Sequence, residues 1–238
     1  MVPSARRAWV SATVPAVVML AGCVPTQRIA ARARLVDARI LASQNLPVVG
    51  RADPQVSVGA PVVIHGASGT AIVVSVRNDS PRVLTDLPIS VGIRDRRGRP
   101  EYLNRSANLD YFSSHVAAIA PHAAVTWVFT SGRRVAPRTG AFATVGFPLF
   151  HPSLGDGLPQ VVASADGVGS VSVTNRSGIP QYDLPVYAVA TRAGREVAAG
   201  VLSVPHLGTR GRMTVTVNLL GNSRGAALRL LALPTIFN

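Results

Sequence analysis

Short apolar runs alternate with polar positions along most of the chain, and clusters of turn-forming residues separate them. Residues 89–94 read Ile-Ser-Val-Gly-Ile-Arg, so every second side chain is apolar. This two-residue period is that of a strand with one buried face. Residues 71–76 form a mostly β-branched run bounded by turn residues, as expected of a strand. Because such segments recur roughly every 8–12 residues, the pattern predicts an all-β chain of the sandwich type.

The same pattern occurs twice. Residues 74–88 read VSVRNDSPRVLTDLP and residues 171–185 read VSVTNRSGIPQYDLP, with eight of fifteen positions identical. The correspondence continues downstream with small insertions, and each copy ends in an apolar run stopped by proline. A unit of about 85–97 residues is longer than a solenoid repeat, so it predicts two domains of one fold. We place these β-sandwich domains at residues 58–149 and 158–238, joined by a linker at Phe150–Leu158.

The repeated polar residues are predicted to have structural roles. Asn78 and Asn175 begin Asn-x-Ser triplets at equivalent positions, where an asparagine side chain can hold a turn. Asp86 and Asp183 precede Leu-Pro in both copies. We expect both carboxylates to lie in equivalent turns and to accept hydrogen bonds from nearby backbone amides.

The first 22 residues have the pattern of a secretory signal. Arg6 and Arg7 precede a mostly apolar stretch at 8–20, which is short beside the roughly 20 residues of a transmembrane helix. The order Leu-Ala-Gly-Cys at 20–23 resembles the lipobox of bacterial lipoproteins. The resemblance implies cleavage after residue 22 and acylation of Cys23 by fatty chains such as palmitate. Two or more chains hold a protein stably on a bilayer, which predicts an anchor facing the extracytoplasmic side.

Residues 23–57 are then predicted to be a lipidated tether that is partly ordered. Apolar residues fall on one helical face between 29 and 40, yet residues 31–35 also alternate, so a helix and a strand both remain open. Cys23 is the one cysteine of the chain. Once it is acylated no disulfide can form within the chain, and the fold must depend on its hydrophobic core.

All 24 basic residues are arginine, and the formal net charge is +13. Together with the abundance of alanine, valine and glycine, this composition is typical of a high-GC genome and suggests an actinobacterial source. A basic surface favours anionic lipid, cell-wall polymers or nucleic acid. We do not expect nucleic acid as a partner, because the chain is exported and its arginines are scattered without interleaved aromatic residues.

Both copies resemble the FxLYD-type immunoglobulin-like domains of bacterial envelope lipoproteins. The resemblance rests on an Asn-x-Ser turn, an alternating strand and a hairpin glycine such as Gly98. Val91 and Arg94 replace aromatic residues of the family strand in the first copy, and Thr191 replaces its aspartate in the second. The resemblance implies two tandem immunoglobulin-like β-sandwich domains outside the cytosol, and it implies no catalytic residues.

The candidate chemistry is sparse. The chain has five histidines, and the nearest pair, His115 and His122, lacks the close spacing of zinc ligands. No serine stands in a G-x-S-x-G elbow, and the eleven carboxylates form no suggestive pair. We therefore expect no enzyme, no metal site and no cofactor.

One segment contains more potential binding side chains than the rest of the chain. Residues 101–116 form an insertion of the first copy, with the densest group of aromatic, amide and charged side chains. Binding residues gather on loops held by a rigid scaffold, and tyrosine, phenylalanine and arginine are common interface anchors. A structural role, in which the aromatic residues close one end of the sandwich, is the alternative. The candidate partner-binding residues are Tyr102, Arg105, Asp110, Tyr111, Phe112 and His115.

These observations favour a membrane-anchored lipoprotein that acts as a non-enzymatic binding or adaptor module in the cell envelope. Its partner would be an envelope protein or a wall polymer. Two alternatives remain open. One is an envelope enzyme or metal carrier that uses the histidines and the 101–116 loop. The other is an electrostatic binder of anionic lipid or cell-wall polymer.

Overall fold

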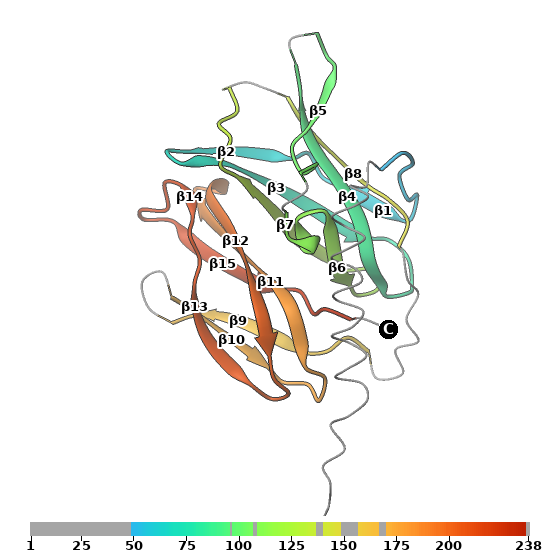
Figure 1. Cartoon of the computed structure of the whole chain (residues 1–238), viewed down its shortest axis with the longest axis vertical. Coiled ribbons are helices and arrows are strands. Elements are labelled where there is room, and N and C mark those ends of the chain that lie inside the picture. The colour runs from blue at the N-terminus through green and yellow to red at the C-terminus, as the bar shows by residue number, and fades with distance from the viewer. Residues whose placement is uncertain are drawn as a thin grey trace, which may run out of the picture.

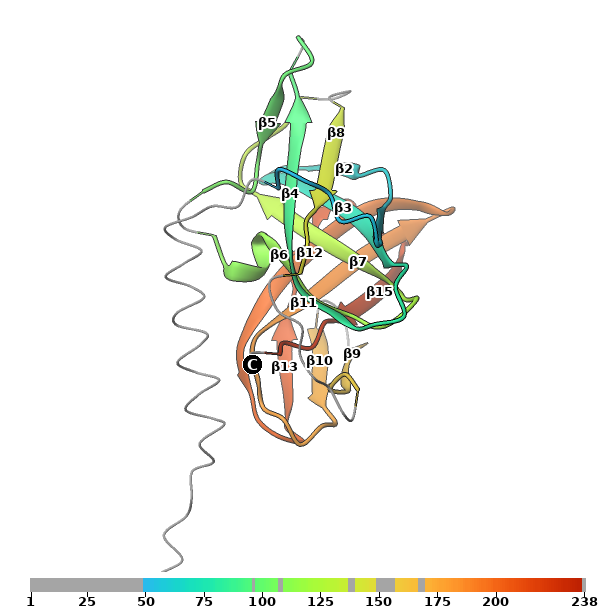
Figure 2. The same ribbon diagram turned by 90° about the vertical axis from the view of Figure 1, so that its right-hand side faces the viewer.

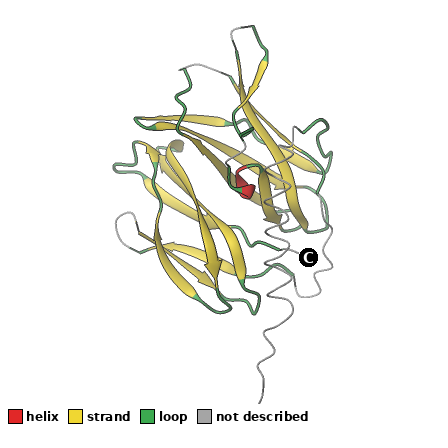
Figure 3. Cartoon of the chain, viewed as in Figure 1, coloured by secondary structure: helices red, strands yellow, loops and turns green. Residues whose placement is uncertain are grey.

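The computed structural model describes residues 49–95, 97–106, 109–136, 140–148, 157–166 and 170–236. Within these ranges every regular element is a β-strand, apart from one 3-10 turn, η1, at Tyr111–Ser113. The strands form antiparallel sheets arranged as two sandwiches (Figure 1, Figure 3). The all-β prediction is confirmed.

The first sandwich contains two sheets. In one, β3 pairs with β1, β2 and β7, and in the other β4 pairs with β5, β6 and β8. The turn η1 lies just before β6. The strands are β1 (Val56–Val58), β2 (Val62–Gly66), β3 (Gly69–Asn78), β4 (Leu84–Arg94), β5 (Pro100–Tyr102), β6 (His115–Ile119), β7 (Ala124–Ser131) and β8 (Ala141–Val145).

The second sandwich repeats this plan. One sheet has the order β13-β10-β9 and the other has the order β14-β12-β11-β15. Figure 2 shows the two sandwiches from the side. The strands are β9 (Val161–Ala165), β10 (Ser170–Asn175), β11 (Gln181–Arg192), β12 (Arg195–Leu207), β13 (Arg212–Thr216), β14 (Leu220–Gly221) and β15 (Ala227–Ala232).

The two sandwiches share a hydrophobic core. Strands β3 and β7 turn one face, with Trp127, toward the β4 sheet. Their other face carries Val73 and Val128, which are 2% and 1% exposed because β11, β12 and β14 of the second sandwich cover them. From the opposite side Tyr187 and other apolar residues of the second copy enter the core of the first. The four sheets therefore form one continuous stack (Figure 1).

Backbone contact also joins the copies where β2 meets β14. A Cβ at Gly66 would lie 3.1 Å from the Gly221 nitrogen. Gly221 has a φ of +102°, and a Cβ there would come within 2.7 Å of the Ile64 side chain. Only glycine fits this approach without strain.

The first sandwich begins before residue 58, contrary to the predicted boundary. The Val49 amide donates to the Ser90 hydroxyl at 2.9 Å, and the Asp53 amide donates to the Val145 carbonyl at 3.0 Å. The β1 strand then pairs with the end of β3. Residues 49–57 are thus part of the sandwich and not of a tether. Cys23, the segment 29–40 and most of the predicted linker lie outside the described residues.

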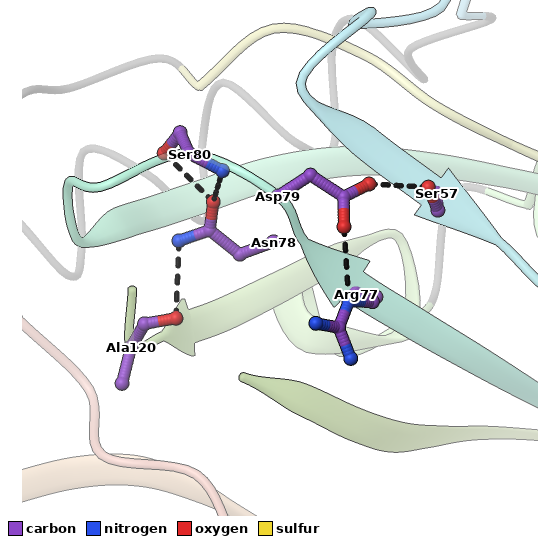
Figure 4. A network of polar contacts seen from close by, with 6 residues as sticks. All are labelled: Ser57, Arg77, Asn78, Asp79, Ser80 and Ala120. Atoms are coloured by element: carbon purple, nitrogen blue, oxygen red, sulfur yellow. Dashed lines mark hydrogen bonds and ion pairs between the residues drawn. The ribbon is translucent and has the colours of Figure 1, made fainter. Parts of the chain in front are cut away.

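The Asn-x-Ser triplets are turn formers in both copies, as predicted. The Asn78 side chain donates to the Arg82 carbonyl at 2.6 Å. It also donates to the Ala120 carbonyl at 3.1 Å and accepts from the Ser80 amide and hydroxyl (Figure 4). Next to it, Asp79 accepts from Arg77 and Ser57. The Asn78 side chain is fully buried, so these hydrogen bonds satisfy an amide that has no access to water.

The second copy contains the same network. Asn175 donates to the carbonyls of Ile179 and Gly208 at 2.8 and 3.0 Å, and Ser177 donates to it at the same distances that Ser80 shows to Asn78. Asn175 is also fully buried. The repeat seen in the sequence is thus a repeat of hydrogen bonds.

The prediction that Asp86 and Asp183 lie in turns is wrong. They lie within β4 and β11, with φ values of +54° and +45°. Each faces a gap in the strand pairing, opposite Ala117 in one copy and Pro205 in the other. Aspartate tolerates the left-handed region better than most residues, which accounts for its use at both sites.

We expect the shared core to make the two sandwiches unfold together. Val128→Ala removes two buried methyl groups from the contact and should lower the free energy of unfolding by about 2 kcal/mol. Denaturant unfolding should show one cooperative transition in both proteins. Val162→Ala, at a position 38% exposed on β9, serves as control and should change stability by less than about 0.5 kcal/mol. Two separate transitions, with only one shifted, would contradict the shared core.

Because the two Asn-x-Ser turns have the same hydrogen bonds, we expect their loss to lower stability by similar amounts. Asn78→Ala and Asn175→Ala should each destabilise the protein by about 1–3 kcal/mol, because each removes the hydrogen bonds by which a buried amide holds its turn. Urea titration of the two variants measures the loss, with the exposed Asn218→Ala as the control. A loss confined to one of the two copies would show that the networks are not equivalent in energy.

Candidate binding site

The 101–116 insertion interrupts a strand. In the second copy β12 pairs with β11 along nearly its whole length. In the first copy the same edge of β4 is covered in two pieces, by β5 at one end and by β6 at the other. The chain between these pieces leaves the sheet and forms a loop that includes η1.

Asn104 fills the gap that this interruption leaves. Its side chain accepts from the Val91 amide at 3.0 Å and donates to the carbonyls of Ile89 and Ser113 at 2.7 and 3.2 Å. The amide of Asn104 thus replaces the peptide group that a continuous strand would supply. A buried strand edge needs such a partner.

Tyr111 and Asp86 form the polar centre of the loop. The Tyr111 hydroxyl lies 2.6 and 2.7 Å from the two oxygens of the Asp86 carboxylate. Burial raises the pKa of Asp86 to about 6, against the opposing effect of the Tyr111 hydrogen bond. Burial, the charge of Asp86 and the shared hydrogen bond all raise the pKa of Tyr111, so the phenol stays protonated as the donor.

His115 completes this group. Its ring stacks on Tyr111 with 4.0 Å between centroids, and its Nδ1 lies 3.1 Å from the Tyr111 carbonyl. Burial lowers the pKa of His115 to about 4, although that hydrogen bond acts in the opposite direction. The Trp127 indole donates to the carbonyls of Phe112 and His115 at 3.2 and 3.3 Å, which ties the loop to the core of the sandwich.

The predicted binding residues therefore separate into two groups. Tyr111, Phe112 and His115 are 8%, 7% and 3% exposed, so they close the end of the sandwich and are not exposed anchors. Their burial agrees with the alternative structural role, in which the aromatic residues close one end of the sandwich. The other three candidates, Tyr102, Arg105 and Asp110, are partly or fully exposed.

Tyr102 belongs to a cluster on the projecting hairpin of β4 and β5 (Figure 1, Figure 2). Its ring meets Phe142 edge to face at 5.4 Å, and the Arg94 guanidinium lies 5.4 Å from the centre of the Phe142 ring. Phe142 covers Gly92, where a Cβ would lie 2.5 Å from the ring. Arg97 and Arg99 extend the positive charge of this hairpin, although Asp95 pairs with Arg99 at 2.9 Å.

A cleft between the sandwiches is the site that sequence reasoning missed. It has a volume of about 210 Å³ and lies where the loop of η1 meets β7, β11 and β12. Domain interfaces are common places for binding sites. The 101–116 insertion, recognised in the sequence, forms one wall of the cleft. No local sequence pattern identified the other wall, which the second copy supplies. The cleft is lined by Leu109, Asp110, Tyr111, Phe112, Ser113, Thr130, Asp183, Pro185, Val201, Leu202 and Ser203.

The histidines do not gather in the described part of the chain. His65 on β2, His122 between β6 and β7, and His206 on β12 are exposed, and His115 is buried at the start of β6. His151 lies outside the described residues. Among the residues that the structure describes, no group of three or more His, Cys, Asp or Glu side chains could hold a metal ion.

Comparison with known proteins adds no family. No protein-family model matches the chain, and no curated protein matches it. Within the described ranges no helix has the length and apolar character needed to cross a membrane.

The buried loop predicts two opposed pH effects. The raised pKa of Asp86 contributes stability at low pH that is lost as the pH rises from about 4 to 6. The lowered pKa of His115 contributes stability above pH 6.5 that is lost as the pH falls toward 4. Each effect is on the order of 3 kcal/mol, so between pH 4 and 6.5 they largely offset each other in the native protein.

Single variants should separate them. Asp86→Asn should leave the His115 effect alone, so that stability falls on acidification from pH 6.5 to 4. His115→Asn should leave the Asp86 effect, so that stability gains on acidification relative to the native protein. Urea unfolding at a series of pH values measures both. Asp79 and Asp95 lie at the surface with lowered pKa values, and they add the same acid dependence to every protein. Parallel pH profiles of the two variants would contradict this assignment.

Proposed function

We propose that the protein is an extracytoplasmic lipoprotein, anchored through acylated Cys23, that acts as a non-enzymatic binding module of the cell envelope. The order of signal, small residues and Cys23 supports the anchor. The repeated sandwiches with their Asn-x-Ser turns support modules of the FxLYD type. The proposed partner is an envelope protein.

The cleft beside η1 is the observation that carries the binding proposal. Its walls combine apolar side chains, such as Leu109 and Val201, with polar groups at Asp110 and Ser203. Since the shared core joins its two walls, the cleft is built before any partner arrives. A preformed site loses less entropy on binding than a flexible one. An extended apolar segment of an envelope protein fits a groove of this kind.

Electrostatic binding is the second candidate function, and the β4–β5 hairpin favours it. This hairpin projects from the end of the first sandwich and carries Arg94, Arg97 and Arg99 (Figure 2). The partner would be anionic lipid or an anionic wall polymer. Salt weakens such contacts strongly, whereas it weakens binding in an apolar cleft little.

Site-specific photo-crosslinking in living cells tests the leading proposal. A photoreactive residue in place of Asp110, at the rim of the cleft, should give a discrete adduct with an envelope protein. The same residue in place of Ser164, exposed on β9, is the control and should give none. A Cys23→Ala protein should appear in the soluble fraction and should lose the adduct if the partner is in the membrane.

Other outcomes would contradict the proposal. Equal adducts at both positions would show chance collisions, and no adduct at Asp110 would exclude a partner in the cleft. Loss of surface binding in Arg94→Gln/Arg97→Gln, together with loss at high salt, would favour the electrostatic candidate instead.

A further inference from the structure

A second pocket lies between the sandwiches at the other end of β7 and β11. We call it the Tyr187 pocket, and its volume is about 120 Å³. The cleft described above is lined by Thr130 of β7 and by the start of β11. This pocket is lined instead by the start of β7 and by the later part of β11. It is lined by Ala124, Thr126, Tyr187, Val189, Thr191, Glu196, Arg229, Leu230 and Leu231.

The Tyr187 hydroxyl has no hydrogen-bond partner among the residues that the structure describes. It is the one buried side-chain polar atom of the described residues that lacks a partner. Tyr187 as a whole is 1% exposed. Burial raises the pKa of Tyr187, so its hydroxyl keeps the proton and is available as a donor. An unpaired buried hydroxyl costs about 1–3 kcal/mol, and phenylalanine would avoid that cost. Because this hydroxyl oxygen has almost no exposed surface, an acceptor from outside the chain reaches it only after neighbouring side chains move.

A β-bulge places Glu196 in the same pocket. Ala190 pairs with Ala198, but Thr191 pairs with Glu196, so Val197 is an extra residue in β12. With regular pairing Thr191 would face Val197, and Glu196 would point to the opposite side of the sheet. Bulges commonly redirect a side chain next to a functional site. Here the redirected side chain is a carboxylate.

Arg229 of β15 supplies the opposite charge. Arg229 pairs in register with Val189, so it lies on the same face of the sheet as Tyr187 and Glu196. Strand spacing and rise put the Cα atoms of Glu196 and Arg229 about 12 Å apart, on either side of β11. Neither side chain has an ion-pair or hydrogen-bond partner within the described ranges. The space between them suits a short molecule with two charges.

We infer that the Tyr187 pocket binds a small zwitterion with one carboxylate and one ammonium group, such as a free amino acid or a dipeptide. The carboxylate lies between Arg229 and the Tyr187 hydroxyl, which donates to it. The ammonium group lies at Glu196. A ligand with a single charge would be repelled by one of the two side chains or would leave it unpaired. The pair therefore selects for a ligand with both charges. This site is separate from the cleft proposed to hold an envelope protein, and it does not depend on that proposal.

Calorimetric titration of the full mature chain tests the inference with four probes. Alanine and alanyl-alanine carry both charges, N-acetylalanine carries only the negative charge, and alaninamide carries only the positive charge. One of the two zwitterions should bind saturably below about 10 mM, and the singly charged probes should bind at least about tenfold more weakly. The better zwitterion identifies the source as a free amino acid or a peptide.

Variants assign the binding to this pocket. Glu196→Gln and Arg229→Gln should each weaken binding of the zwitterion by about tenfold or more, and Arg195→Gln, exposed at the start of β12, should not weaken it. Tyr187→Phe should also weaken binding, while the melting temperature of the ligand-free protein stays the same or rises. A clear loss of stability in Tyr187→Phe would show that the hydroxyl already has a structural partner and would overturn the inference. The inference would also be overturned if no zwitterion bound, or if none of the three substitutions weakened binding.

Discussion

The apolar contact between the two sandwiches is the interaction on which the rest of the structure depends. The sheet of β3 and β7 buries Trp127 on one face and Val73 and Val128 on the other. Strand β11 is buried on both faces in the same way, with Leu184 on one side and Tyr187 on the other. A sheet with two apolar faces needs a layer over each, so the copies are stacked and not merely strung together. Both pockets exist because this stacking brings β7 against β11.

The two copies keep the same turns but complete the same strand edge differently. Asn78 and Asn175 bond the same kinds of carbonyl, and Asp86 and Asp183 adopt the same unusual backbone conformation. In the second copy β12 pairs with β11 along nearly its whole length, and the bulge next to Thr191 redirects Glu196. In the first copy the insertion interrupts the equivalent strand, and the Asn104 side chain bonds the backbone of β4 that is left without a neighbour. The two copies thus share one framework, with two different pockets at their interface.

The insertion shows where composition is ambiguous. Tyrosine, phenylalanine, histidine and asparagine suit an interface anchor and a closed sandwich end equally well. Asn104 and Tyr111 are buried because they satisfy β4 and Asp86, which lie more than ten residues away along the chain. Asp86 was misplaced for a related reason, since Asp-Leu-Pro has the residue types of a turn. Its position inside β4 follows from pairing with β6, which no local pattern encodes.

The sequence by itself determined the strands, the duplication and the Asn-x-Ser turns. These features depend on side-chain period and on hydrogen bonds within a few residues, so a local pattern is sufficient to predict them. Tertiary structure alone decided which sheet faces meet, where the first sandwich begins, and which side chains line the cleft and the Tyr187 pocket. One extra residue in β12 moves Glu196 from one face of its sheet to the other. The composition of the chain is the same in both cases, so only strand pairing can tell them apart.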